Sequence, residues 1–403
     1  MNNGAIILAT NKNKMQKHPA LCEILLTPVI DLLISAVKNS GTDNICVITD
    51  SDQVKNHTNG KVSFTVDSFL SAENFIRYHK DGNLMVFSCN KPFIDEKTLA
   101  LTINHHIEKE NNVTAICDKT NITAGYCFKA EVLIDILPKL IDGNSIEDCI
   151  ERICNCGIYI SENENISLCT DSSIQIHRLC EIAKLEILEK KIAEGIEIPC
   201  FDGVIIGHGC SIGKGTKILP NTIICGNVTI GENCTLGPNS YIENACIGNS
   251  VIFNNSQIRN ASIKDNANIG PFVHIRPDSV VGSYVHLGNF VEIKNSSIDS
   301  GTSVSHLTYV GDSDVGKNVN FGCGVVTVNF NGKTKNRTVI KDRAFIGCNT
   351  NLVAPVTVGE NSYTAAGSTI TQDVPDNSLA IARVRQTNKH GWVKEKQPYR
   401  KKV

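Results

Sequence analysis

The feature that most constrains this chain is an aliphatic side chain that recurs every six residues from position 206 onward. The repeat starts as Ile206, Ile212, Ile218, Ile224 and Ile230, and it continues with occasional one-residue shifts to Val315. A period of six fits neither the 3.6-residue period of an α-helix nor the two-residue period of a simple strand. It is typical of a parallel β-helix, in which each hexapeptide forms one flat face and a turn, and three faces complete a coil.

Glycine often follows the aliphatic residue, as at Gly213, Gly231 and Gly248. We expect these glycines to serve the tight corners between faces, because glycine adopts backbone angles that other residues avoid. The aliphatic side chains would stack inside the rod, and the Asn, Ser, Thr and Asp side chains between them would cover its outside. This arrangement resembles the left-handed β-helix of hexapeptide acyltransferases.

Residues 1–170 have a different pattern, in which short apolar runs alternate with amphipathic stretches. The apolar runs are Ala5–Ala9, Ile45–Ile48, Leu84–Ser88 and Val113–Cys117, and the amphipathic stretches are Pro28–Lys38, Phe69–Tyr78 and Asp95–Lys109. This alternation predicts a doubly wound, Rossmann-like α/β sheet. The sequence therefore predicts an α/β domain at 1–171, a connecting helix at 172–195, a β-helix at 196–380 and a basic tail at 381–403.

Composition excludes several classes of protein. The chain has 403 residues with 39 Lys and Arg against 41 Asp and Glu, a balance that argues against a nucleic-acid or membrane-surface partner. No apolar run approaches the ~20 residues of a membrane span, and the start lacks a signal-peptide pattern, so we expect a cytoplasmic protein. Seventeen cysteines without a C-x-x-C pair indicate buried free thiols rather than a disulfide scaffold or a zinc site.

The repeat is interrupted in a few places that lie close together in the sequence. Motifs at 275–279, 288–298 and 305–312 depart from the six-residue pattern, and the segment 320–337 loses it. That segment contains Lys333, Lys335 and Arg337, so it predicts a loop that leaves the rod and binds an anion.

These motifs resemble a known family. The resemblance is carried by R-P at 276–277, G-N-F-V-E-I-K at 288–294, H-L-T-Y-V-G-D at 306–312, N-F-G-C-G at 320–324, N-F-N-G at 329–332, L-V-A-P-V-T-V-G at 352–359 and L-A-I-A-R-V-R-Q-T at 379–387. Over almost all of 200–392, the chain is similar to the acetyltransferase half of the bifunctional glucosamine-1-phosphate N-acetyltransferase/N-acetylglucosamine-1-phosphate uridylyltransferase family. The resemblance implies a homotrimer with active sites between subunits, and acetyl transfer from acetyl-CoA to the 2-amino group of a sugar phosphate.

The resemblance also implies roles for individual residues. His306 matches the base that removes a proton from the sugar ammonium, a task that suits a neutral imidazole. Without the surrounding motif, a single histidine on a polar surface would be an ordinary surface residue. The positions that match sugar-phosphate contacts are Arg276, Lys294, Tyr309, Asn320, Asn329 and Lys335. The positions that match acetyl-CoA contacts are Cys323, Cys348, Ala366 and Arg383.

Two of the acetyl-CoA positions depart from the family, which has small residues such as Ala and Ser where this chain has Cys323 and Cys348. Cysteine is nearly as small, so we expect binding to persist. An acyl-enzyme on cysteine is the less favoured alternative, because transfer in the family is direct. The basic tail, which includes Lys389, Lys394 and Arg400–Lys402, suits the phosphates of CoA or serves solubility.

The first half resembles the family's uridylyltransferase domain but lacks several of its residues. The phosphate-binding loop L-A-A-G-x-G-T-R-M is replaced by Leu8–Met15, which has no glycine, and Ala20 replaces a lysine. Asn90 replaces an acidic Mg²⁺ ligand, while Asp171 stands where the family has an asparagine ligand. The region around 120–125 also lacks longer sugar-binding segments. We expect a nucleotidyltransferase-like fold that has lost uridylyl transfer, with Mg²⁺ required only if that activity survives.

The favoured hypothesis is an acetyl-CoA-dependent glucosamine-1-phosphate N-acetyltransferase of UDP-N-acetylglucosamine biosynthesis. One alternative is a bifunctional enzyme that retains both activities. Another is a non-catalytic sensor of sugar phosphates or nucleotides that is built on a decayed enzyme.

Overall fold

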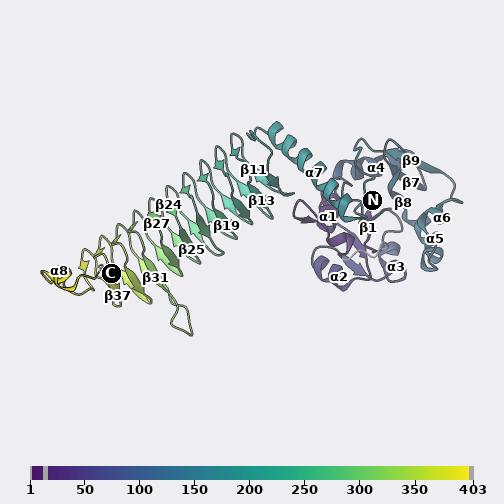
Figure 1. Cartoon of the computed structure of the whole chain (residues 1–403). Coiled ribbons are helices and arrows are strands. Elements are labelled where there is room, and N and C mark those ends of the chain that lie inside the picture. The colour runs from purple at the N-terminus through teal and green to yellow at the C-terminus, as the bar shows by residue number, and fades with distance from the viewer. Residues whose placement is uncertain (1, 12–16, 399–403) are drawn as a thin grey trace. The chain divides into compact units, whose positions relative to one another are not determined.

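The computed structural model describes residues 2–11 and 17–398, and it divides into two compact units. One unit contains residues 1–191 with 205–210, and the other contains 192–204 with 211–403. Figure 1 shows an α/β unit in purple and blue and a rod of stacked coils in green and yellow. Among the described residues, no helix combines the length and the apolar character that crossing a bilayer requires.

The first unit is built on a seven-stranded sheet in the order β5-β4-β1-β6-β8-β7-β9. The strands are β1 (Gly4–Leu8), β4 (Ile45–Ile48), β5 (Phe64–Val66), β6 (Asn83–Ser88), β7 (Val113–Cys117), β8 (Thr123–Lys129) and β9 (Cys156–Ile160). All neighbours are parallel except β8, which runs antiparallel to both β6 and β7. A separate two-stranded ribbon of β2 (Glu23–Ile24) and β3 (Thr27–Pro28) follows the short 3₁₀ helix η1 (Pro19–Leu21).

Helices cover both faces of this sheet. They are α1 (Val29–Asn39), α2 (Asp52–Thr58), α3 (Phe69–Tyr78), α4 (Glu96–Glu108), α5 (Ala130–Ile141), α6 (Ile146–Ile150) and α7 (Ser173–Ala193). Residues of α1, α4 and α7 contribute to one buried core, and residues of α3 and α5 contribute to the other. Side-chain caps begin several of the helices: Ser51, Ser68 and Asp95 each accept a hydrogen bond from a first-turn N–H. The predicted α/β alternation is confirmed.

Residues 205–380 form a left-handed parallel β-helix whose strands make three faces. Its first strand, β10, falls in the segment 205–210 of the first unit. The first face contains β10 (Ile205–Ile206), β13 (Ile223–Cys225), β16 (Tyr241–Glu243), β19 (Gln257–Arg259), β22 (Val273–Ile275), β25 (Val291–Lys294), β28 (Tyr309–Gly311), β31 (Val326–Val328), β34 (Asn351–Val353) and β37 (Thr369–Ile370). The second face contains β11 (Ser211–Ile212), β14 (Thr229–Ile230), β17 (Cys246–Ile247), β20 (Ser262–Ile263), β23 (Val280–Val281), β26 (Ser297–Ile298), β29 (Ser313–Val315), β32 (Thr338–Ile340) and β35 (Val356–Val358). The third face contains β12 (Lys217–Ile218), β15 (Thr235–Leu236), β18 (Ile252–Phe253), β21 (Asn268–Ile269), β24 (His286–Asn289), β27 (Ser303–His306), β30 (Asn320–Phe321), β33 (Phe345–Ile346), β36 (Tyr363–Thr364) and β38 (Leu379–Ala380).

The six-residue period becomes an interior column on each face. Ile224 pairs with Ile242, Ile242 with Ile258, and Ile258 with Ile275, so equivalent side chains lie directly above one another. All four are fully buried. Beyond the last strand the tail has one short helix, α8 (Trp392–Lys396), and the predicted tail residues Arg400–Lys402 lie outside the described residues.

The corners confirm the role expected for glycine only in part. The left-handed backbone angles fall most often on asparagine, as at Asn239, and also on glycine, as at Gly237 and Gly270. Gly213 and Gly231, which follow the aliphatic positions, are not left-handed, but a Cβ on Gly213 would lie 2.6 Å from the backbone of Gly231. Gly213 and Gly231 are therefore required because successive coils approach one another closely, whereas asparagine and other glycines occupy the left-handed corners.

Only the second part of the predicted loop at 320–337 leaves the rod, as a β-hairpin between β31 and β32, because β30 and β31 keep 320–328 in the coil. Phe330 and Lys335 form an antiparallel β-bridge, and the Asn336 N–H donates to the Asn329 carbonyl at 2.8 Å. The Asn331 side chain closes the tip by accepting from the N–H groups of Lys333 and Thr334. Figure 1 shows this hairpin leaving the rod beside β31.

None of the 17 cysteines forms a disulfide bond in the structure, as predicted, but the expectation that they are buried holds for only part of them. The buried ones are Cys22, Cys46, Cys89, Cys117, Cys127, Cys149, Cys210, Cys225 and Cys234. Cys154, Cys156, Cys246 and Cys348 are exposed, and the remaining four are intermediate. The six-residue pattern does not reveal this exposure, because outward and inward positions both accept a small side chain.

Candidate active site

A hollow of about 320 Å³ lies on the β-helix where the first face turns into the second. We call it the cation hollow, and its lining residues are Arg276, Pro277, Asp278, Lys294, Asn295, Asp312 and Lys335. Three predicted phosphate-binding cations, which are 59 positions apart in sequence at their extremes, thus lie around one space. The coils bring Arg276, Lys294 and Asp312 onto neighbouring levels, and the hairpin brings Lys335 over them.

Asp312 is the buried anchor of the cation hollow, with its side chain only 5% exposed. It accepts hydrogen bonds from Asn329 Nδ2 and, at 2.5 Å, from Asn295 Nδ2, and it lies 3.7 Å from Lys294 Nζ. Burial opposes its ionisation. The two amide donors and the nearby lysines outweigh burial and hold the pKa of Asp312 below its ordinary value.

Lys335 lies beside Lys294, and this neighbouring ammonium lowers the pKa of Lys335. Two lysines therefore share one carboxylate, so the cation hollow has more positive than negative charge near Asp312. A dianionic phosphate would remove this repulsion. Arg276 lies at the edge of the hollow, where its guanidinium donates to Glu292 at 2.7 Å.

Tyr309 connects the cation hollow to the neighbouring corner. Its hydroxyl accepts from Asn329 Nδ2 at 3.3 Å, so its ring extends along β28 toward Asp312. Gly311 makes this possible, since a Cβ at that position would overlap the Tyr309 hydroxyl and ring. Gly311 and Asp312 belong to the Y-V-G-D segment of the family motif, but the sequence alone does not indicate a role for either residue.

His306 lies at the other end of the same segment, at the corner where the third face turns into the first. Asn289 pairs with His306 on β24 and β27, and the registers of β27, β30, β33 and β36 continue this column. We call it the donor corner; its members on successive coils are Asn289, His306, Cys323, Cys348 and Ala366.

Backbone hydrogen bonds connect the coils at the donor corner. The Asn349 N–H donates to the Cys323 carbonyl and the Gly367 N–H donates to the Cys348 carbonyl, each at 2.8 Å. Arg383 extends the corner, with its Cδ 3.8 Å from where a Cβ of Gly367 would lie. Small side chains along one edge, with a cation at its end, suit a long thioester arm that carries phosphates.

One predicted residue is not brought into either group. Asn320 stands on the outer side of β30 between Ser303 and Phe345, and it does not line the cation hollow. Within the described chain, the site is therefore divided between two neighbouring corners that the strand β28 joins.

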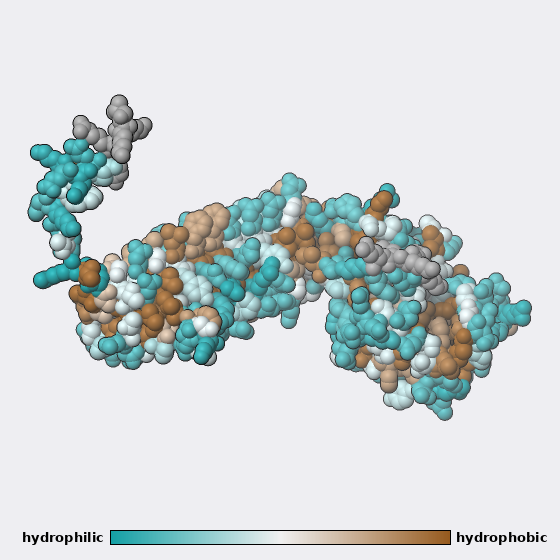
Figure 2. All heavy atoms as spheres, turned by 60° about the horizontal axis from the view of Figure 1, so that its bottom comes forward, coloured by the Kyte–Doolittle hydropathy of each residue, from teal (hydrophilic) through white to brown (hydrophobic). Residues whose placement is uncertain are grey.

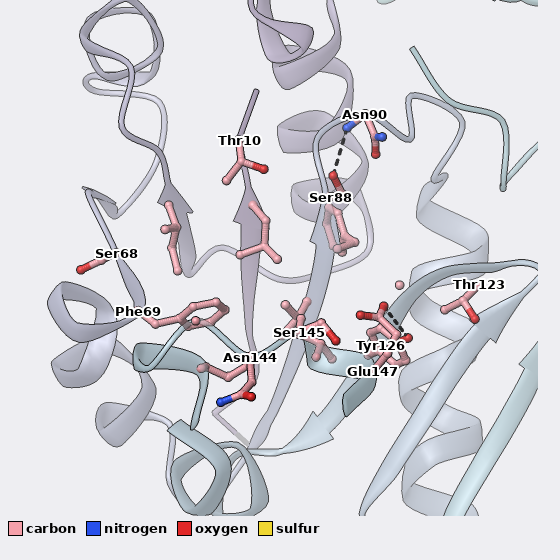
Figure 3. A pocket seen from close by; sticks show the side chains of 18 of the residues that line it. Thr10, Ser68, Phe69, Ser88, Asn90, Thr123, Tyr126, Asn144, Ser145 and Glu147 are labelled. Carbon is pink, nitrogen blue, oxygen red and sulfur yellow. Dashed lines mark hydrogen bonds between the residues drawn. The ribbon is translucent and has the colours of Figure 1, made fainter. Parts of the chain in front are cut away.

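The first unit has a larger cavity, of about 790 Å³, at the carboxyl ends of its central strands. Figure 3 shows Thr10, Ser88 and Asn90 among the side chains that line it, together with the hydrogen bond that the Tyr126 hydroxyl donates to Glu147. In open α/β sheets, ligands bind at this edge, where the strand order reverses. Residues 12–16 of the predicted phosphate loop lie outside the described residues.

The two predicted metal positions of the first unit lie together. Asn90 Nδ2 donates to Asp171 Oδ1 at 2.9 Å, and Asn90 Oδ1 is buried with no hydrogen-bond partner among the residues that the structure describes. One carboxylate and one free amide oxygen fit the oxygen-rich coordination of Mg²⁺, which commonly takes one or two carboxylates together with substrate phosphates. Among the residues described, no group of three or more His, Cys, Asp or Glu side chains could hold a metal ion.

Known proteins share both units of this chain. The pattern described as "Bacterial transferase hexapeptide (six repeats)" matches residues 209–244, 260–295 and 337–372. A bifunctional protein GlmU from Acetivibrio thermocellus is 36% identical over 449 positions, covering 97% of each chain. A bifunctional protein GlmU from Caldicellulosiruptor saccharolyticus is 45% identical over 284 positions, covering 68% of this chain and 61% of that one. A 4-diphosphocytidyl-2C-methyl-D-erythritol synthase structure from Anaerococcus prevotii has a TM-score of 0.36 and 15% identity over 45% of this chain and 96% of that one.

The alignment with the Acetivibrio protein is longer than the 403 residues of this chain, so that relative has segments that are absent here. The hexapeptide pattern matches the six-residue repeat in three stretches of the rod. Identity of this level over nearly the full length of both proteins is decisive, and the chain belongs to the family of bifunctional GlmU proteins.

Proposed function

We propose that this protein is an acetyl-CoA-dependent N-acetyltransferase that acts on glucosamine-1-phosphate and supplies UDP-N-acetylglucosamine biosynthesis. The observation that carries the proposal is the pair of corners on either side of β28. His306 lies at one corner, and the cation hollow lies at the other. A sugar phosphate that spans β28 would direct its anionic end toward Lys294 and Lys335 and its amino group toward His306.

The chemistry follows from this placement. Acetyl-CoA supplies the acetyl group as a thioester. The sugar ammonium has no lone pair, so His306 takes a proton from it before its nitrogen can attack. Lys294, Lys335 and the Arg276 fork hold the phosphate. Tyr309 and Asn329, which are hydrogen-bonded to each other, are positioned to contact the sugar ring.

The test is the rate of N-acetylglucosamine-1-phosphate formation by the wild type and His306→Ala. A positioned base contributes roughly 10²–10⁴ in rate, so we expect a loss of that order. His286→Ala is the matched control, because His286 is also an outward-facing histidine on the third face. Equal rates for the wild type and His306→Ala would remove His306 from the mechanism.

We further propose that the active unit is a homotrimer in which a second copy completes each site. The residues after Asn289 and His306 at the donor corner, Phe290 and Leu307, are each 59% exposed. Phe290 stacks on Phe272 of the preceding coil with ring centroids 5.1 Å apart. Apolar side chains next to a catalytic base would exclude water if another copy of the rod covered them.

For the first unit we propose that uridylyl transfer is lost, because the loop that should cradle the triphosphate has no glycine. One observation favours the bifunctional alternative. Asn90 and Asp171 exchange the amide and the acid of the family's pair, so one carboxylate and one amide remain together. Pyrophosphate release from UTP and N-acetylglucosamine-1-phosphate with Mg²⁺ tests the proposal, and turnover there would support the alternative.

Metal binding can be measured without turnover. Titration with Mn²⁺, followed by its paramagnetic signal, should show a site that Asp171→Ala weakens at least tenfold if the pair holds a metal. Asp142→Ala, at the end of α5, is a control for a change of charge alone.

A further inference from the structure

Two cysteine thiols at the donor corner form a pair that the proposed reaction does not use. Cys323 follows β30 and Cys348 follows β33, and the pairing of Phe321 with Ile346 places the two cysteines on neighbouring coils in register. Cys348 is exposed and Cys323 is partly exposed, and both are free thiols. The preceding member of the same column is His306.

The spacing of the coils suits a disulfide bond. Neighbouring strands lie about 4.7–4.9 Å apart, which is within the ~4.4–6.8 Å that separates the Cα atoms of bonded cysteines. The Cys348 thiol is already turned toward the earlier coil, since a Cβ built on Gly322 would lie 2.9 Å from Cys348 Sγ. Gly322 directly precedes Cys323, so rotation of the two side chains can bring the sulfur atoms together.

Several other cysteines differ from this pair. Burial raises the pKa of the thiols of Cys46, Cys89 and Cys127 to about 12, so these remain unreactive. Cys246 is exposed on the second face, but its in-register neighbours are Thr229 and Ser262. Because no cluster of three ligating side chains among the described residues could hold a metal, a metal site does not account for the pair.

We propose that Cys323 and Cys348 form a reversible disulfide bond that closes the acetyl-CoA side of the site under oxidising conditions. This inference rests on the proposed acetyltransferase function, because it assigns the donor corner to the thioester arm. A bond between the two coils would fix both side chains across that path, and reduction would open it again.

The oxidant is hydrogen peroxide, and the disulfide bond forms in two stages. The Cys323 sulfur gives up its proton to His306 and attacks peroxide, which forms a sulfenic acid on Cys323 and releases one water. The Cys348 sulfur then displaces the sulfenic hydroxyl, which leaves as a second water, and the S–S bond forms. Two thiols are oxidised by two electrons and peroxide is reduced by two. A dithiol reductant reverses the reaction.

The experiment treats the full chain with hydrogen peroxide, removes the excess with catalase, and divides each sample. One part is digested without reductant, and mass spectrometry searches for a peptide that links Cys323 to Cys348. The other part is assayed for N-acetylglucosamine-1-phosphate by chromatography, before and after dithiothreitol. We expect the linked peptide, at least a tenfold loss of rate, and recovery with dithiothreitol.

Variants are compared by the ratio of their oxidised to their reduced rate, so their own basal rates do not enter. Cys348→Ser and Cys323→Ala should each lose less than half of their rate on oxidation, whereas Cys246→Ser should respond as the wild type does. Thermal melting confirms that each variant is folded. Absence of the linked peptide, or an equal loss in Cys348→Ser, overturns the proposal.

Failure of the proposed function gives a different result. If the fully reduced wild type forms no acetylated product, the acetyltransferase assignment is wrong, and the peptide map still decides whether the disulfide exists.

Discussion

At the scale of single residues, the cation hollow is set for an anion before any ligand arrives. Lys294 and Lys335 repel each other, and Asp312, the carboxylate 3.7 Å from Lys294 Nζ, is already engaged by Asn295 and Asn329. The charge of Asp312 therefore interacts with four neighbours, Asn295, Asn329, Lys294 and Lys335. The repulsion raises the free energy of the unliganded site, and a bound phosphate converts that repulsion into attraction.

This arrangement predicts the effect of Lys335→Gln. A hydrogen bond to a charged group contributes about 1.5–3 kcal/mol, so we expect KM for the sugar phosphate to rise roughly ten- to hundredfold. The melting temperature without ligand should not fall, because the variant removes a repulsion. Steady-state kinetics and thermal melting measure the two effects.

Lys333→Gln provides the comparison, since Lys333 lies at the tip of the same hairpin and does not line the cation hollow. An equal rise of KM in both variants would show that the hairpin attracts anions only through its general charge.

At the scale of elements, the sequence allows the faces of the rod to be predicted but not its corners. The position of the interior column follows directly from Ile224, Ile242 and their equivalents, because burial demands an aliphatic side chain at each level. The corner residues are selected for a left-handed backbone, which Asn, Asp, Phe and Tyr all adopt here. The amino-acid sequence alone therefore does not distinguish a glycine required for a left-handed corner from a glycine required where two coils approach closely.

The candidate site, too, can be predicted from the sequence only in part. The motifs identified His306, Lys294 and Lys335, but only the coiling of the chain shows that Asp312 is their shared, buried partner. Asn90 and Asp171 are 81 positions apart, and their hydrogen bond could not be derived from either residue by itself.

A prediction for helix α4 follows from a buried histidine. His106 is 1% exposed, with Nδ1 2.8 Å from Thr114 Oγ1, and its Nε2 has no hydrogen-bond partner within the described part of the chain. Burial, helped by the charges of Lys129 and His105, lowers the pKa of His106 to about 4. Between about pH 6.5 and pH 4 the unfolded chain binds a proton that the folded chain does not, so stability falls as the pH falls through this window.

Between pH 7 and pH 5, the free energy of unfolding of His106→Leu should therefore fall by about 1–2 kcal/mol less than that of the wild type. Urea unfolding followed by circular dichroism at 222 nm measures this difference. The signal at 222 nm reports helix content, and helices α1 to α7 all begin in the first unit. His18 and His79, whose pKa values burial also lowers, remain as a source of residual slope. An unchanged slope in the variant would contradict the assignment.

At the scale of the whole molecule, each unit has its own cores and its own kind of site. The first unit builds two apolar layers around a sheet, and the second stacks coils around interior columns. Loss of uridylyl transfer in the first unit would therefore leave acetyl transfer in the second untouched, which explains how the glycine-free loop can coexist with complete motifs at 306–312. Within the rod, Phe290 and Leu307 at the donor corner are exposed.

The trimer proposal covers these side chains with a second copy of the chain, and Phe290→Asn tests it. Phe290 has a left-handed backbone at a corner where asparagine is common, so the substitution should preserve the coil while removing an exposed ring. Light scattering should show a mass of three chains for the wild type and a smaller mass for the variant, with acetyl transfer falling in parallel. Tyr284→Asn is the matched control, because Tyr284 is left-handed and 68% exposed but belongs to a different corner. If both variants keep the mass and the rate of the wild type, the donor corner is not an interface and a single rod must complete the site.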